Sequence, residues 1–555
     1  MTLPLASVSP RSLREILQSA SEFALLDVRE QEEFSREHVL LACCAPLSRL
    51  ERLAPPLVPC RRTPVIVMDG GGNDGLDRAV RAARTLRAMG YGDVRVLEGG
   101  LAAWKAGGGV TVNGVGALSK GFGEYVESAQ ETPRLTPEEV KALLDDPSVP
   151  TIVIDVRPQA EYRRMNIPGS VNLPGCEVTY RLAEVVTDPD TTIIINCAGR
   201  TRSIIGTQTL LNAGIPNRVA ALKGGTMNWQ LAGFELEYGA ERPVPPSTPK
   251  GRQTAAERIA RVAERYGVRF ADAGEVARWQ AEAGEQTLYL FDVRLPEEYE
   301  AGHLPGSRCA QGGQLVQATD EYAAVRNGRY VLVDDDELRA IMTAHWLGQM
   351  GLPHVFVLRG GITGAAPVLA PAGLVRGPEP APELSVPPDT GANQAPLTPE
   401  ALRRLLGEKP GPLLLNVGAS DRHRDRHIPG ARWIARAWLP QAAARFPDAE
   451  HIVLTAEDGA HAALAAGDAR GLWPGARVDA LVGGTPAWEA AGLPLEKGMP
   501  CALCPEDDIW YRPYTDINAS REAMRGYFDW ESGLVEKIRA DGCASFDVGP
   551  AGCAR

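Results

Sequence analysis

The stretch "TIVIDVRPQAEY", Thr151–Tyr162, runs four β-branched residues into Asp-Val-Arg. Three further stretches have the same form: "FALLDVREQEEF" (Phe23–Phe34), "LYLFDVRLPEEY" (Leu288–Tyr299) and "PLLLNVGASDRH" (Pro412–His423). Each is followed by a glycine pair, and these pairs begin at positions 99, 224, 360 and 483. The Asp-Val or Asn-Val steps, at 27, 155, 292 and 416, recur every 124 to 137 residues, and the glycine pairs recur every 123 to 136. Two markers that keep the same spacing indicate four copies of one domain.

Each copy repeats one order of elements. A Ser or Thr followed by Pro predicts the start of a short amphipathic helix in Ser9–Gln18, Thr136–Leu144 and Thr398–Leu406. The buried strand, an Ile-Pro-Gly type of turn, a second apolar strand, an Ala-rich or Leu-rich helix, a third strand and the Gly-Gly turn follow. Short apolar strands that alternate with helices are typical of a parallel sheet covered on both faces. We therefore predict an α/β fold of four tandem domains, each a parallel sheet flanked by helices.

The markers also set the expected domain boundaries. We predict domains at 6–112, 134–240, 257–375 and 397–495, followed by a C-terminal tail, 496–555, with one further helix over 519–540. Stretches rich in proline, 241–252 and 377–396, favour semi-extended linkers, and 114–133 is a less obvious connector.

Composition narrows the function classes. The chain has 555 residues, 44% of them hydrophobic, and a net charge of -12. An acidic surface repels nucleic acid and anionic membranes, so we expect neither as a partner bound through overall charge. No signal peptide and no run of about 18 apolar residues is found, which favours a cytoplasmic location. Ten cysteines without framework spacing predict mostly reduced thiols.

One cysteine stands out, in "IIINCAGRTRS", Ile193–Ser203. Cys197 comes directly after a predicted strand and before a predicted helix, at the sheet edge where α/β folds bind ligands. A short loop there points backbone N–H groups inward, the helix adds its positive dipole end, and Arg200 and Arg202 add charge. We therefore expect the pKa of Cys197 to fall below the ordinary value of about 8.5, which makes it a ready nucleophile. Gly199 allows a close approach of the backbone.

With these motifs in this order, the chain resembles the rhodanese family of sulfurtransferases, in particular its tandem four-domain bacterial members. The resemblance implies that the Cys197 thiolate takes the outer sulfur of thiosulfate or 3-mercaptopyruvate, becomes a persulfide, and passes the sulfur to a thiol or cyanide acceptor, without a cofactor or metal. The basic loop residues favour thiosulfate. The loop that cradles the donor would be Ala198, Gly199, Arg200, Thr201, Arg202 and Ser203.

The other three copies lack this sulfur. Alignment on the apolar strand that precedes the Ala-rich or Leu-rich helix puts Asp69, Asp335 and Ala456 at the cysteine position, give or take one residue. None of these side chains can carry a persulfide, so we predict one catalytic domain and three degenerate ones.

Three arginines outside the loop are weaker candidates. Arg163 and Arg164 could recruit an anionic donor, and they could equally be a solvated surface pair. For Arg157 we expect a structural salt bridge with Asp155 first and a substrate contact second.

Two alternatives to sulfur transfer remain open. A cysteine phosphatase of the same fold needs five residues between Cys and Arg, whereas Cys197 and Arg202 enclose four, which fits a sulfane sulfur better. A binding or scaffold protein that relays sulfur to a partner enzyme is compatible with three degenerate domains. Four domains suit a monomer or a homodimer, and we favour the dimer.

Other cysteines are lesser candidates. Cys176 could approach Cys197 as a resolving thiol. The pair Cys501 and Cys504 has the Cys-x-x-Cys spacing, but no strand precedes it and acidic residues follow it. We predict an incidental pair, in a loop that packs the tail back onto the fourth domain.

Overall fold

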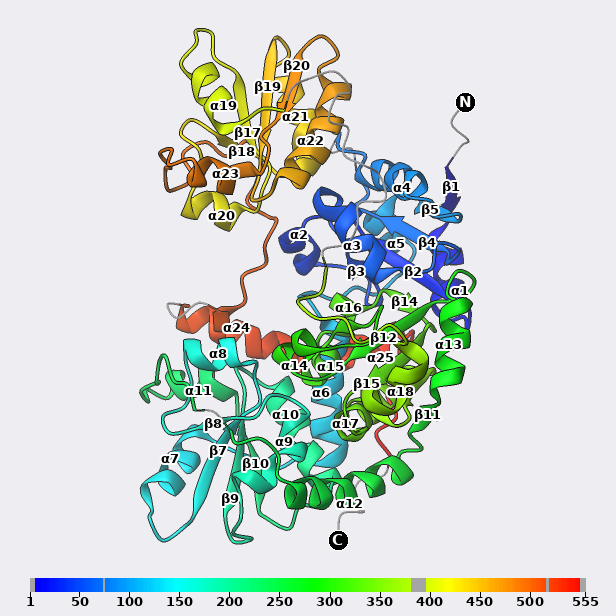
Figure 1. The fold of residues 1–555 in the computed structure, drawn as a ribbon, viewed down its shortest axis with the longest axis vertical. Coiled ribbons are helices and arrows are strands. Elements are labelled where there is room, and N and C mark those ends of the chain that lie inside the picture. The colour runs from blue at the N-terminus through cyan, green and yellow to red at the C-terminus, as the bar shows by residue number, and fades with distance from the viewer. Residues whose placement is uncertain (1–4, 73–74, 243, 381–395, 516–518, 550–555) are drawn as a thin grey trace.

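The computed structural model describes residues 5–72, 75–242, 244–380, 396–515 and 519–549. Within these residues the chain forms four α/β units, named units 1 to 4 in chain order, each built on its own sheet (Figure 1). The predicted fold class is therefore confirmed.

Unit 2 has the sheet order β6-β10-β9-β7-β8, with every neighbouring pair parallel. The chain order alternates strands with helices, and helical crossovers join the neighbouring strands β7 to β8 and β9 to β10. The elements are β6 (Arg134–Leu135), α7 (Pro137–Asp145), β7 (Thr151–Asp155), α8 (Gln159–Arg164), β8 (Val171–Asn172), α9 (Glu177–Tyr180), η2 (Leu182–Glu184), β9 (Thr192–Asn196), α10 (Thr201–Asn212), β10 (Val219–Leu222) and α11 (Gly225–Leu231).

Units 1, 3 and 4 repeat this plan. Unit 1 comprises β1 (Ala6–Val8), α1 (Pro10–Leu17), β2 (Phe23–Asp27), α2 (Gln31–Arg36), β3 (Cys43–Cys44), η1 (Leu47–Arg49), α3 (Leu50–Leu57), β4 (Val65–Met68), α4 (Arg78–Ala88), β5 (Val94–Leu97) and α5 (Gly100–Ala106). Unit 3 comprises β11 (Arg269–Ala271), α13 (Ala273–Ala281), β12 (Leu288–Asp292), α14 (Pro296–Ala301), β13 (Arg308–Cys309), α15 (Gly312–Gln317), α16 (Thr319–Tyr322), β14 (Val325–Arg326), β15 (Arg329–Val333), α17 (Leu338–Gln349), β16 (Val355–Leu358) and α18 (Gly361–Leu369). Unit 4 comprises α19 (Pro399–Leu406), β17 (Leu413–Asn416), α20 (Ser420–Asp425), β18 (Arg432–Trp433), η3 (Arg436–Trp438), α21 (Leu439–Arg445), β19 (His451–Thr455), α22 (Gly459–Leu472), β20 (Arg477–Ala480) and α23 (Gly484–Ala490).

The three predicted Ser-Pro or Thr-Pro helix starts are confirmed. Ser9, Thr136 and Thr398 each cap a helix by accepting a backbone N–H with the side chain, and proline occupies the first turn. The central strands, such as β4 (Val65–Met68) and β9, are mostly apolar and fully buried because both faces of each sheet are covered. In β9, for example, Ile193 and Ile195 face one core while Ile194 faces another.

The units associate in two pairs. Units 2 and 3 meet where Gly175 packs on Gly313, so closely that a Cβ added at Gly175 would lie 2.5 Å from the Gly313 Cα. Units 1 and 4 meet where α3 of unit 1 lies against η3 of unit 4, and Arg436 forms a salt bridge with Glu51 there at 2.7 Å. Strand β14 of unit 3 also pairs with β2 of unit 1, so one core runs through units 1, 2 and 3.

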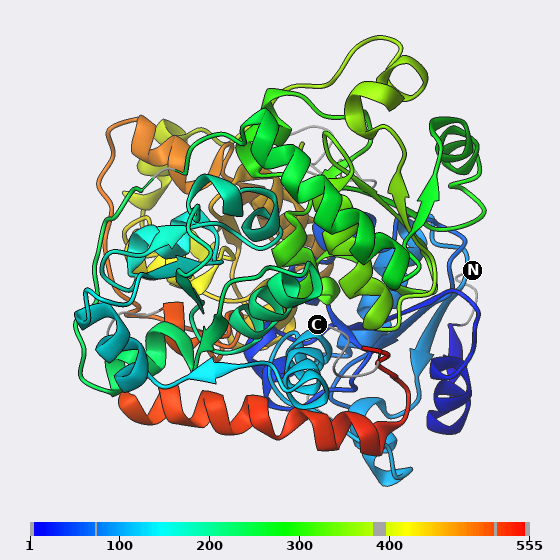
Figure 2. The ribbon, with the colours of Figure 1, turned by 90° about the horizontal axis from the view of Figure 1, so that it is seen from below.

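The connecting segments are more structured than the sequence indicated. The connector 114–133 contains helix α6 (Ala117–Gln130), and the expected linker 241–252 already enters helix α12 (Pro249–Arg265). Most of the expected linker 377–396 lies outside the described residues. The tail contains η4 (Pro513–Thr515), α24 (Arg521–Ser532) and α25 (Leu534–Asp541), and the last two run along one side of the molecule (Figure 2). No helix in the described ranges combines the length and the apolar character needed to cross a membrane.

Candidate functional site

Cys197 lies where the sequence placed it, between the end of β9 and the start of α10. Its Sγ donates to the Ser203 hydroxyl at 3.4 Å, and that hydroxyl donates to the Arg200 carbonyl at 2.9 Å. The Cys197 carbonyl accepts the backbone N–H of Thr226 at 2.8 Å and its hydroxyl at 2.9 Å. The turn after β10 therefore holds the cysteine loop in place.

The second glycine of the pair explains why the Gly-Gly motif recurs. Gly225 has a φ of +56°, and a Cβ there would lie 2.3 Å from the Cys197 carbonyl oxygen. In each unit the residue after the second glycine donates its N–H to the carbonyl at the cysteine position: Leu101 to Asp69, Thr226 to Cys197, Ile362 to Asp334 and Thr485 to Ala456. The motif is therefore the support of the loop in all four units.

We expect Gly225→Ala to lower both stability and activity. A left-handed backbone costs about 1–2 kcal/mol for a residue with a Cβ, and the collision with Cys197 adds to that cost. Gly214→Ala is the matched control, since Gly214 has a φ of +66° but open space around its Cβ. Chemical unfolding and turnover of both variants measure the difference. Equal losses of stability and activity in the two variants would show that the contact with Cys197 contributes nothing.

The electrostatics of Cys197 differ from the prediction. Burial raises the pKa of the Cys197 thiol above its ordinary value, although Arg202, the Ser203 hydroxyl and the N–H groups of Ser203 and Gly199 oppose that shift. The side chain is 1% exposed. The expectation of a lowered pKa is therefore wrong for this closed site, because loss of solvent outweighs the anion-stabilising loop.

The two loop arginines are also less available than expected. Arg200 is held by two carboxylates of α6, Glu124 at 2.5 Å and Glu127 at 2.7 Å. Arg202 makes a two-pronged contact with Glu161, at 2.7 and 2.8 Å. Of the two arginines, Arg202 is the one whose charge lowers the pKa of the Cys197 thiol. The positive charge of the loop is therefore largely balanced within the protein.

The other arginine candidates are separate from the loop. Arg157 is buried and paired with Asp155 at 2.7 Å, which is the expected structural salt bridge. Asp155 also accepts a hydrogen bond from the side chain of Asn196, the residue before Cys197, at 2.8 Å. The Asp155–Arg157 pair therefore supports the end of β9. Arg163 is exposed and paired with Glu241 at 2.8 Å, and Arg164 is exposed.

The C-terminal tail forms a part of the site that sequence reasoning missed. One apolar cluster joins loop and turn residues to the tail: Ala198, Met227, Tyr514, Met524 and Tyr527. Arg202 also lies over the Tyr514 ring at 5.9 Å. The aromatic residues in "DIWYRPYTD" (Asp508–Asp516) indicate a buried contact, but the sequence does not indicate which unit they contact. The tail therefore packs onto unit 2.

The cysteine position of the other units is now fixed by the sheet register. Asp155 pairs with Asn196 and Asp292 with Val333, so the residue equivalent to Cys197 in unit 3 is Asp334 and not Asp335. Asp69 and Ala456 are confirmed by the same register.

Units 1 and 3 fill their loops with their own carboxylates. Asp334 accepts the backbone N–H groups of Glu337 at 2.7 Å and Arg339 at 2.8 Å. Asp69 accepts those of Gly71 and Ala79, both at 3.0 Å. The loop is therefore an anion cradle, and unit 2 places a sulfur in it.

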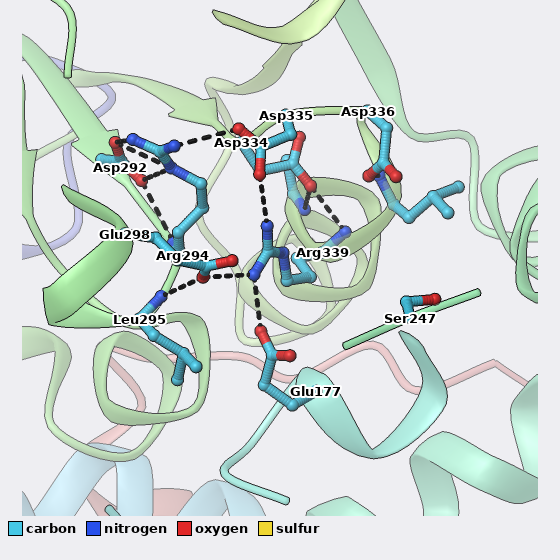
Figure 3. Close-up of polar contacts among 12 residues, drawn as sticks. Glu177, Ser247, Asp292, Arg294, Leu295, Glu298, Asp334, Asp335, Asp336 and Arg339 are labelled. Atoms are coloured by element: carbon cyan, nitrogen blue, oxygen red, sulfur yellow. Dashed lines mark hydrogen bonds and ion pairs between the residues drawn. The ribbon is translucent and has the colours of Figure 1, made fainter. Parts of the chain in front are cut away.

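Around the Asp334 loop, buried charges join units 2 and 3 (Figure 3). Arg339 is fully buried and contacts Glu177 of unit 2 at 2.8 Å, Glu298 at 2.7 Å and Asp335 at 2.9 Å. Asp335 in turn accepts from Arg294 at 2.9 Å. The loop of unit 3 has thus become part of an interface.

The remaining cysteine predictions have mixed outcomes. Cys176 is buried, shares a hydrogen bond with Thr343 at 3.1 Å, and has its pKa raised to about 12 by burial. The segment of Cys501 and Cys504 does pack on unit 4, where the backbone N–H of Trp433 donates to the Cys501 carbonyl at 3.0 Å. The tail beyond them leaves unit 4 for units 1 and 2, contrary to the prediction. The described residues contain no cluster of three or more side chains suited to hold a metal ion, and the nine described cysteines are free thiols.

Comparison with known proteins places these features in a family. The model of the rhodanese-like domain matches residues 9–107, 136–232 and 272–366, together just over half of the chain. The crystal structure of a thiosulfate sulfurtransferase from Pseudomonas aeruginosa has a TM-score of 0.91 and 47% identity, and the match covers 98% of this chain and 100% of that one.

Two curated relatives match short parts of the chain. A helix-turn-helix-type transcriptional regulator of Mycobacterium tuberculosis is 34% identical over 88 residues, which is 16% of this chain and 38% of the regulator. An uncharacterized Synechocystis protein is 34% identical over 106 residues, which is 19% of this chain and 55% of that protein. The chain thus spans about half or less of each of these relatives.

Proposed function

The chain belongs to the family of rhodanese-like domains, and from that membership we propose that it is a sulfurtransferase in which Cys197 carries the transferred sulfur. The observation that carries the proposal is the anion cradle. Units 1 and 3 occupy it with the carboxylates of Asp69 and Asp334, and unit 4 has Ala456 there. Unit 2 has a nucleophilic side chain at this position, which makes it the proposed catalytic unit.

The proposed reaction has two displacements at sulfur. The Cys197 thiolate attacks the outer sulfur of the donor, a new S–S bond forms, and the bond to the sulfonate breaks, so that sulfite leaves with the electron pair. The thiolate of an acceptor then attacks the outer sulfur of the persulfide and releases the Cys197 thiolate. Backbone N–H groups of Gly199 and Ser203, together with Arg202, stabilise the anion at both stages.

We propose thiosulfate as the preferred donor. The cradle suits an anion, and the Pseudomonas aeruginosa protein with 47% identity is a thiosulfate sulfurtransferase. A phosphatase fits less well, because Cys197 and Arg202 enclose four residues and Arg202 is already engaged by both oxygens of Glu161.

We expect kcat/KM for thiosulfate to exceed that for 3-mercaptopyruvate by about tenfold or more, a range that one differential contact supplies. Steady-state assays with both donors and a thiol or cyanide acceptor measure the ratio. Mass spectrometry of the peptide that holds Cys197, after donor alone, should show the mass of one added sulfur. Turnover of an aryl phosphate with no turnover of either sulfur donor would refute the proposal.

A further inference from the structure

Helix α24 of the tail packs on α6 and on α11 of unit 2 (Figure 1), and it contacts the loop of Cys197 through Tyr527 and Glu531. A Cβ built at Gly199 would sit 3.5 Å from the Tyr527 ring and 3.6 Å from Oε2 of Glu531. Both tail residues are buried, and Glu531 is 1% exposed. The cover on the nucleophile therefore carries an ionisable group, and this group comes from outside the four repeated units.

The Glu531 carboxyl is only half satisfied. Its Oε1 accepts the Thr201 hydroxyl at 3.3 Å, whereas Oε2 has no hydrogen-bond partner among the described residues. A buried carboxylate oxygen without a donor is costly, since it has lost water and gained nothing in exchange. The free oxygen points at the loop, so whatever charge Glu531 carries acts there.

The groups that face Glu531 from each packed element bring the pKa of its carboxyl close to neutral pH. Burial and the like charge of Glu124 on α6 raise its pKa to about 7, against the attraction of Lys120 on α6 and of Arg200 in the loop. Arg200 is already engaged by Glu124 and Glu127, and Lys120 donates to the Gln317 carbonyl at 2.8 Å. The tail side adds the phenols of Tyr514 and Tyr527, whose own pKa values burial raises. Glu531 therefore changes charge near neutral pH.

We propose that Glu531 is a positioning residue for the sulfur transfer, which lets the Cys197 loop hold anions when its carboxyl is neutral and opposes them when it is ionised. This inference rests on the proposed function, since it deepens the account of the same site. The loop must hold a thiolate, a persulfide and an anionic donor in turn, and a carboxylate against Gly199 and Thr201 repels each of them. Donor binding is then linked to proton uptake at Glu531.

Glu531→Gln tests this directly, because the amide keeps the shape, still accepts from Thr201 and cannot ionise. In the wild type we expect KM for thiosulfate to rise about tenfold between pH 6 and pH 8, with kcat less affected. In Glu531→Gln the rise should stay within about twofold over that interval. Glu536→Gln, an exposed site on α25, is the matched control and should keep the wild-type profile.

A second readout separates this inference from the proposed function. The pH profile of iodoacetamide alkylation, followed on the Cys197 peptide by mass spectrometry, needs no turnover. Removal of a carboxylate charge that lies against Gly199 and Thr201 of the cysteine loop should shift the midpoint of that profile downward in Glu531→Gln, by about half a pH unit or more. If the shift appears but no donor is turned over, the proposed function fails, whereas the effect of the Glu531 charge on the Cys197 loop stands.

Two results would overturn the inference. One is a Glu531→Gln variant whose KM and alkylation profiles both follow the wild type, since the carboxyl charge would then not reach the loop. The other result needs only the wild type and applies if the variant does not fold. A KM for thiosulfate that is constant from pH 6 to pH 8 would show that no carboxyl at the site changes charge over that range.

Discussion

Cys197→Ser should abolish sulfur transfer, with a loss of turnover on the order of 10³-fold or more. A hydroxyl in the same cradle is neither ionised near neutral pH nor able to carry a sulfane sulfur, so neither displacement can proceed. The structure predicts little change in folding, because Ser fits the space and can donate to Ser203 as the thiol does at 3.4 Å. Steady-state assays with thiosulfate, together with an unfolding curve, measure both effects.

Cys176→Ser is the matched control for that experiment. Cys176 is the other buried cysteine of unit 2, and its hydrogen bond to Thr343 at 3.1 Å can be kept by a hydroxyl. We expect its activity to remain within a few-fold of the wild type. Full activity in Cys197→Ser would remove the basis of the proposed reaction, and loss of activity in both variants would restore Cys176 as a resolving thiol.

Arg339→Met should be the most destabilising single change among those considered, at about 3–5 kcal/mol. Arg339 is fully buried and serves three carboxylates, so its removal leaves Glu177, Glu298 and Asp335 without their shared cation. The loss of Arg339 destabilises Glu177 most, because Glu177 is only 3% exposed and burial already raises its pKa. Urea unfolding measures the loss.

Two further variants define the origin of that loss. Arg359→Met, at an exposed arginine of unit 3, should change stability by less than about 0.5 kcal/mol. The double variant Arg339→Met with Glu177→Gln should recover part of the stability, since it removes the most buried of the three charges that lose Arg339. A single variant as stable as the wild type would show that this buried cluster does not hold units 2 and 3 together.

The sequence predicted the repeated architecture because its signals are local. The β-branched run before Asp155, the caps at Ser9 and Thr136, and the glycine pair at Gly224 each act within a few residues. The shift from Asp335 to Asp334 has an equally local cause. Three consecutive aspartates look alike in sequence, and only the pairing of β12 with β15 distinguishes them.

The surroundings of Cys197 could not be predicted in the same way. The partners of Arg200 lie on α6, in a segment without a strong pattern, and Glu531 is 330 residues from its contact Thr201. A single sequence contains no signal for contacts at that separation. The position of the basic loop was therefore predicted correctly. Its predicted excess of positive charge was wrong, because the carboxylates that balance the arginines come from elsewhere in the chain.

The pairing of the units has a consequence for biosynthesis. Units 2 and 3 are neighbours in the chain and can associate as soon as both have left the ribosome. Glu51 of unit 1, however, must wait for Arg436, which is 385 residues later. The helix that contacts the loop of Cys197, α24 at Arg521–Ser532, follows all four units in the chain. The loop of Cys197 is therefore synthesised long before the helix that packs on it, and its contacts with Tyr527 and Glu531 can form only after α24 has been made.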